Sequence, residues 1–62
     1  MKPEAEVQDY LDQNYFKNGA ELEKAKALLR KMYPGVIFNC KCLFNRRPSR
    51  FILVTDLIHF IA

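Results

Sequence analysis

The sequence has little of what enzymes use for catalysis. Its 62 residues include one histidine, and they contain no glycine-rich phosphate loop, no G-x-S-x-G nucleophile motif and no H-E-x-x-H metal motif. Asp9 and Asp12 fall on one face of the first expected helix, near Glu6. Such carboxylates are more often a solvated helix surface than an acid–base pair. We therefore predict a protein that is not an enzyme and that uses no cofactor.

A segment for export or membrane insertion is also lacking. Residues 1–4 lead into acidic residues rather than an apolar run, so we expect no signal peptide. The most apolar segment, residues 51–62, is too short to span a bilayer and contains Asp56. These absences predict a soluble, cytoplasmic protein with no membrane partner.

The two cysteines do not form a recognisable metal or disulfide motif. Cys40 and Cys42 are two positions apart, which on a strand places their side chains on one face about 6.5 Å from each other. That separation is too large for a disulfide, and a C-x-C pair without further ligands is a poor zinc motif. His59 is expected roughly 13 Å along the strand from the partner of Cys40. We therefore predict two buried free thiols and no metal site.

Size and charge indicate one small, mildly basic domain covering residues 1–62. Half of the residues are apolar and 27% are charged, a composition that favours a folded chain. The formal net charge is +3 at pH 7 and the sequence pI is about 9.1. This balance is compatible with nucleic acid or another acidic partner.

The first half of the sequence predicts two helices. Val7, Leu11 and Tyr15 recur at helical spacing, and Pro3 suits a first helical turn, which predicts a helix from about residue 3 to 15.

A second helix is predicted from about residue 19 to 33. Asn18 can cap its N-terminus, and Glu21 stands three positions later, as in a capping box. Pro34 and Gly35 then end the helix and turn the chain.

The second half predicts two antiparallel strands, at about residues 36–44 and 51–60. Apolar residues alternate along the first run, and the second is rich in isoleucine, valine, leucine and phenylalanine. A loop over residues 46–49 would place Phe44 opposite Phe51. The predicted fold is therefore α+β, in the order α-α-β-β, with both helices on one face of the β-hairpin.

An isolated hairpin leaves open edges and, here, apolar residues on both faces. We predict that the second strand pairs across a two-fold axis in a homodimer, or that its outer face lies on a larger protein. The alternative is that residues 57–62 form a short helix that covers the hairpin.

The distribution of cations predicts a nucleic-acid-binding regulator that contacts the DNA or RNA backbone with a basic hairpin tip and a basic helix face. Charges at a hairpin tip also prevent aggregation, so solubility alone is the competing explanation. The predicted nucleic-acid-binding residues are Lys24, Lys26, Arg30, Lys31, Lys41, Arg46, Arg47 and Arg50.

A second hypothesis is a protein-binding inhibitor or adaptor, of the kind that small mobile-element proteins often are. It would dock through the outer apolar face of the hairpin, or through its open edge by strand addition. The predicted interface residues are Ile37, Leu43, Ile52, Val54, Ile58 and Phe60.

Overall fold

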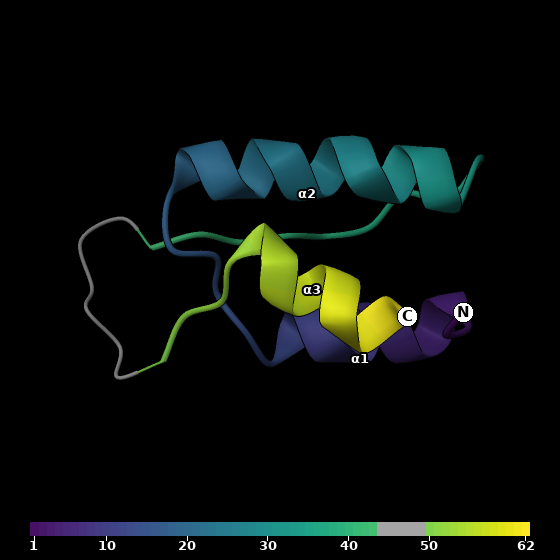
Figure 1. The fold of residues 1–62 in the computed structure, drawn as a ribbon, viewed down its shortest axis with the longest axis horizontal. Coiled ribbons are helices and arrows are strands. Elements are labelled where there is room, and N and C mark those ends of the chain that lie inside the picture. Colours follow the sequence, from purple (N-terminus) through teal and green to yellow (C-terminus); the bar gives the residue numbers. More distant parts are fainter. Residues whose placement is uncertain (44–49) are drawn as a thin grey trace.

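The computed structural model describes residues 1–43 and 50–62. This part of the chain contains three α-helices: α1 (Glu4–Asp12), α2 (Gly19–Met32) and α3 (Val54–Ile61). In Figure 1, α1 and α3 lie together on one side of the molecule and α2 lies on the other. Residues 36–42, hereafter the extended segment, run between them, and both termini lie at the same end.

The predicted β-hairpin is wrong, and with it the α+β fold class, because the described residues form helices and no β-strand. The runs at 36–44 and 51–60 were expected to pair directly and antiparallel. Instead Phe16 lies between them, with an isolated parallel bridge to Cys42 on one side and another to Ile52 on the other. The homodimer prediction assumed that the second strand of the hairpin had a free edge. A structure of one chain does not test self-association, so the homodimer stays a prediction.

The linker between α1 and α2 occupies the central position because its backbone is bonded on both sides. Phe16 donates its N–H to the carbonyl of Lys41 at 2.9 Å and accepts the N–H of Leu43 at 3.1 Å. Ile52 donates its N–H to the carbonyl of Tyr15 at 2.8 Å, and its own carbonyl accepts the N–H of Lys17 at 3.0 Å. These bonds satisfy backbone groups that would otherwise be buried without partners.

The second predicted strand is mostly α3. Leu57 and Ile61 are one helical turn apart and are 0% and 1% exposed, so the helix buries one face of this apolar run. The Asp56 carboxylate accepts the N–H of Leu53 at 2.7 Å and satisfies a free donor of the first turn. The alternative of a short helix near the C-terminus is closer to the structure, although the helix begins earlier, at Val54, and covers no hairpin.

The first two helices lie in the predicted ranges, but α1 ends at Asp12, short of residue 15. Its last carbonyls are bonded by side chains: Lys41 donates to the carbonyl of Asp12 and Asn14 to that of Tyr10, each at 2.7 Å. A cation is favourable at this negative end of the helix dipole.

At the start of α2, the Asn18 side chain accepts the N–H of Glu21 at 2.9 Å. The predicted N-cap is therefore confirmed, and it fixes the point where the linker turns into the helix.

All three helices and the Phe16 linker contribute to one core. Two contacts close the end of the molecule at which the termini lie: Lys2 donates its N–H to Ile61 at 3.3 Å, and the Tyr33 hydroxyl donates to the carbonyl of Lys2. The buried residues are Val7, Leu11, Phe16, Ala25, Leu29, Tyr33, Ile52, Leu57 and Ile61. Across residues 1–43 and 50–62, no helix has the length and apolar character needed to cross a membrane.

A type II turn links α2 to the extended segment. Val36 donates its N–H to the carbonyl of Tyr33 at 3.2 Å, with Pro34 and Gly35 at the two central positions. The φ angle of Gly35 is 82°, which lies in the left-handed region that L-residues with a side chain avoid.

Gly35→Ala is expected to lower the free energy of unfolding by about 1–2 kcal/mol, because a Cβ in the left-handed region approaches the following carbonyl oxygen. Gly19→Ala is the matched control: Gly19 begins α2, and an added Cβ there meets no atom within 4 Å. Urea denaturation should show a loss for the first variant and none for the second. Equal losses would contradict the turn assignment.

Candidate functional site

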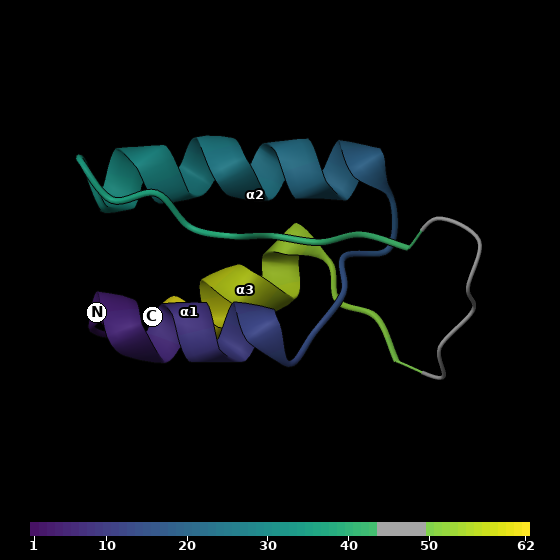
Figure 2. The ribbon, with the colours of Figure 1, turned by 180° about the vertical axis from the view of Figure 1, so that it is seen from behind.

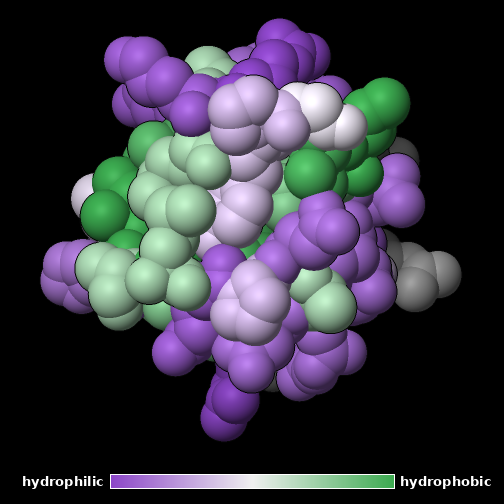
Figure 3. All heavy atoms as spheres, turned by 90° about the vertical axis from the view of Figure 1, so that its right-hand side faces the viewer, coloured by the Kyte–Doolittle hydropathy of each residue, from purple (hydrophilic) through white to green (hydrophobic). Residues whose placement is uncertain are grey.

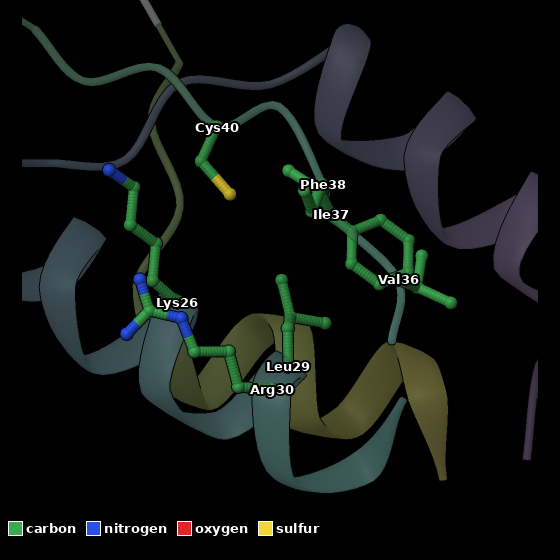
Figure 4. A pocket seen from close by; sticks show the side chains of 7 residues that line it. All are labelled: Lys26, Leu29, Arg30, Val36, Ile37, Phe38 and Cys40. Atoms are coloured by element: carbon green, nitrogen blue, oxygen red, sulfur yellow. The ribbon is translucent and has the colours of Figure 1, made fainter. Parts of the chain in front are cut away.

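A groove of about 350 Å³ lies between α2 and the extended segment. Figure 4 shows its two walls, with side chains of α2 facing side chains of the extended segment. We name it the α2 groove; its lining residues are Lys26, Leu29, Arg30, Val36, Ile37, Phe38 and Cys40.

One wall of the α2 groove is cationic. Lys26 and Arg30 are one helical turn apart on α2, so they share a face and both reach the groove. Lys26 also pairs with Glu23 at 3.7 Å, but both side chains are exposed and such a pair contributes little. Within the described part of the chain, Arg30 has no ion pair.

The opposite wall and the floor are apolar. Leu29 is 2% exposed and forms the floor, while Val36 and Phe38 are half-buried in the wall. The Phe38 ring packs edge-on against Tyr33, with ring centroids 5.4 Å apart and an interplanar angle of 77°. Ile37 is 92% exposed at the rim. The groove therefore combines positive charge with apolar surface that a ligand can cover.

Cys40 contributes a neutral thiol to the groove. Burial raises the pKa of Cys40, and the nearby charge of Lys26 offsets part of that rise. Figure 4 shows the sulfur pointing toward the space beside Leu29 and Lys26. A thiol with a raised pKa is a weak nucleophile, so the groove is better suited to binding than to covalent chemistry. Residues 1–43 and 50–62 contain no His, Cys, Asp and Glu cluster that could hold a metal ion.

A side chain of α1 fixes the extended segment from the other side. The Gln8 amide donates to the carbonyl of Asn39 at 3.1 Å and accepts the N–H of Asn39 at 2.9 Å. This two-bond contact imitates the pairing that a neighbouring strand would supply. It leaves the side of the segment that faces α2 unoccupied by α1.

The predicted basic residues of α2 do not form a single face. Lys26 and Arg30 reach the α2 groove, whereas Lys24 and Lys31 lie roughly 100–160° around the helix from them, by the rotation of 100° per residue. Lys24, Arg30 and Lys31 are exposed as whole residues, and the side chain of Lys26 is 41% exposed. A flat phosphate backbone could therefore meet one pair or the other more easily than all four cations.

The remaining predicted cations are Lys41, Arg46, Arg47 and Arg50. Lys41 is engaged at the end of α1, where its ammonium donates to the carbonyl of Asp12. Arg50 is exposed. Arg46 and Arg47 lie outside the described residues. The predicted basic tip depends on Arg46 and Arg47 and therefore stays a prediction.

The predicted apolar interface is divided between the core and two separate surfaces. Ile52 is 8% exposed and belongs to the core, and Phe60 stacks on Tyr10 with ring centroids 4.1 Å apart. Leu43 and Val54 are half-buried.

Only Ile37 and Ile58 of this set are strongly exposed, at 92% and 42%. Ile37 is on the extended segment and Ile58 on α3; α3 lies in front of that segment in Figure 1 and behind it in Figure 2. Seen from the end that holds the termini, hydrophobic residues gather at two places on opposite sides (Figure 3). In this view, residues that are not hydrophobic lie between the two places.

The sequence indicates some of this site and conceals the rest. The spacing of Lys26 and Arg30 is visible in the sequence, but Gln8 and the apolar wall join the site only through contacts between distant segments. No pattern in the sequence marks Gln8 as the residue that holds Asn39. Compared with known proteins, the chain matches no family model, no curated protein and no solved structure.

Proposed function

We propose that the chain is a small, non-enzymatic protein-binding module, an inhibitor or adaptor, whose α2 groove takes an anionic segment of a larger protein. The observation that supports this proposal most is the position of Lys26 and Arg30 opposite the apolar wall formed by Val36 and Phe38. We place the protein in the cytoplasm, where the free thiols of Cys40 and Cys42 remain reduced.

The two walls supply different parts of the binding free energy. A guanidinium group donates two parallel hydrogen bonds to a carboxylate, which favours Arg30 as the residue that orients an acidic side chain. Covering the exposed part of Ile37 and the half-buried Phe38 adds apolar contact. The net charge of +3 steers an acidic partner toward the protein.

Backbone binding to DNA or RNA is the second candidate, supported by the net charge of +3. The arrangement of the cations favours it less, because Lys24 and Lys31 are turned away from Lys26 and Arg30. Nucleic-acid binding falls steeply with salt through counterion release, whereas docking in a partly apolar groove weakens only modestly. The salt dependence of any complex therefore separates the two candidates.

The double variant Lys26→Ala/Arg30→Ala is expected to weaken binding of an acidic peptide about tenfold, since each contact contributes about 0.7 kcal/mol at a solvent-exposed site. The control Lys24→Ala/Lys31→Ala removes the same charge from the other flank of α2 and should change affinity less than about twofold. Fluorescence anisotropy with a labelled peptide measures both affinities.

Equal losses in the two double variants would show that net charge, rather than the groove, attracts the peptide. A complex with random-sequence duplex DNA, weakened alike by both double variants and steeply by salt, would favour the nucleic-acid candidate instead.

A further inference from the structure

We propose that the captured segment is an extended acidic strand that pairs with the open backbone edge of the extended segment at Phe38 and Cys40. This inference rests on the proposed function and identifies what enters the α2 groove. Strand pairing requires backbone hydrogen bonds to the ligand, whereas attraction by the charges of the groove does not.

The backbone N–H and C=O groups of the extended segment point alternately to its two edges. Successive residues of an extended chain present their N–H and C=O groups to opposite sides. Asn39 uses both groups toward Gln8, while Lys41 and Leu43 bond to Phe16 on that same side. Phe38 and Cys40 alternate with these residues, so their N–H and C=O groups point to the opposite edge, away from Gln8 and Phe16.

This edge has no hydrogen-bond partner within residues 1–43 and 50–62. Among the residues that the structure describes, the backbone groups of Phe38 and Cys40 take part in no hydrogen bond, whereas those of Asn39 take part in two. An extended segment with one satisfied edge and one open edge is a ready template for an added strand. The α2 groove provides about 350 Å³ of space along that edge.

Charge identifies the strand as an acidic one. A strand added to this edge lies about 4.8 Å from the extended segment, and half of its side chains face α2, where Lys26 and Arg30 stand. Carboxylates at those positions meet the two cations. The alternate side chains lie beside Ile37, which is 92% exposed, and apolar residues are favourable there. The expected recognition pattern therefore alternates acidic and apolar residues.

A second copy of this chain is a poorer occupant of the edge. Two-fold pairing along Phe38 and Cys40 would bring Lys26 and Arg30 of both copies to the same interface. Each copy also carries a net charge of +3, and like charges across an interface are unfavourable.

The test uses the peptide acetyl-Glu-Val-Glu-Val-Glu-amide as the probe and follows amide hydrogen exchange by NMR. Saturating peptide should slow exchange at Phe38 and Cys40 at least about tenfold, because their N–H groups become hydrogen-bonded. Exchange at Asn39, whose N–H is already bonded to Gln8, should change little. The same peptide with methylated backbone nitrogens keeps its charges but loses its donors, and should bind at least about tenfold more weakly.

Peptide that binds without slowing exchange at Phe38 and Cys40, or whose N-methylated form binds equally well, would overturn strand addition while leaving the proposed function standing. Failure of this peptide and of other acidic peptides to bind would overturn both. Slow exchange at these two amides that appears without peptide and increases with protein concentration would show that a second copy occupies the edge, and would overturn the acidic-strand assignment.

Discussion

Phe16→Ala is expected to remove most or all of the stability of the fold. Among the residues that the structure describes, Phe16 has the largest fully buried side chain, and it is 1% exposed. Truncating a buried phenylalanine costs about 3–5 kcal/mol, while a chain of 62 residues has a free energy of unfolding of roughly 3–9 kcal/mol. Far-ultraviolet circular dichroism at 25 °C should show partial or complete loss of helix, and urea denaturation gives the remaining free energy.

The effect is large because Phe16 joins three segments of the chain. Its backbone bonds both Lys41 and Leu43, and the linker that carries it also bonds Ile52. A cavity at this position loosens the contact between the extended segment and the residues that lead into α3. Collapse around the cavity is limited because three different segments would have to shift together.

Phe51→Ala is the matched control. The Phe51 ring is 48% exposed and lies 5.6 Å from the ammonium of Lys17, so its removal should cost less than about 1 kcal/mol. The predicted hairpin register would have placed Phe51 on the buried face instead. A large loss for Phe51→Ala together with a small loss for Phe16→Ala would contradict the fold described above.

Gln8→Ala is expected to lower the free energy of unfolding by about 1–2 kcal/mol, because it removes both hydrogen bonds to Asn39. The wall of the α2 groove should also become less ordered, since this contact fixes the extended segment midway between the turn at Gly35 and the bridge at Cys42. Urea denaturation measures the stability, and amide exchange at Asn39 should accelerate.

Gln13→Ala, at the C-cap of α1, provides the control. The Gln13 side chain donates to Asp9 at 3.2 Å on the exposed surface, and loss of such a contact changes stability by less than about 0.5 kcal/mol. Similar losses at the two positions would show that Gln8 does no more than an ordinary surface glutamine.

The first two helices could be predicted because their signals are local. Pro3 and the stripe of Val7 and Leu11 mark α1, and Asn18 caps α2 at the expected position. The end of α1 at Asp12 was not predicted, and nothing in the sequence indicates that Lys41, far along the chain, reaches its last carbonyl.

The C-terminal run was misassigned because its composition fits both a strand and a helix. Isoleucine, valine and phenylalanine favour strands, yet Leu57 and Ile61 also have helical spacing, and Asp56 stands where it can bond the N–H of Leu53. Packing of Leu57 and Ile61 in the core outweighs the intrinsic strand preference.

The position of Phe16 was concealed for a different reason. A phenylalanine between two helices resembles the edge of an apolar stripe, and nothing local indicates that two distant segments run parallel beside it. The candidate site shares this property: the α2 cations could be identified from the sequence, whereas the groove exists only because the extended segment lies against them.

The central claim is that the extended segment is bonded along one edge and open along the other, and amide hydrogen exchange of the free protein tests it most directly. The account predicts slow exchange at Phe16, Asn39, Leu43 and Ile52, whose N–H groups are bonded, and fast exchange at Phe38 and Cys40. Slow exchange alternating along both residues 36–44 and 51–60, as in an antiparallel hairpin, would contradict it.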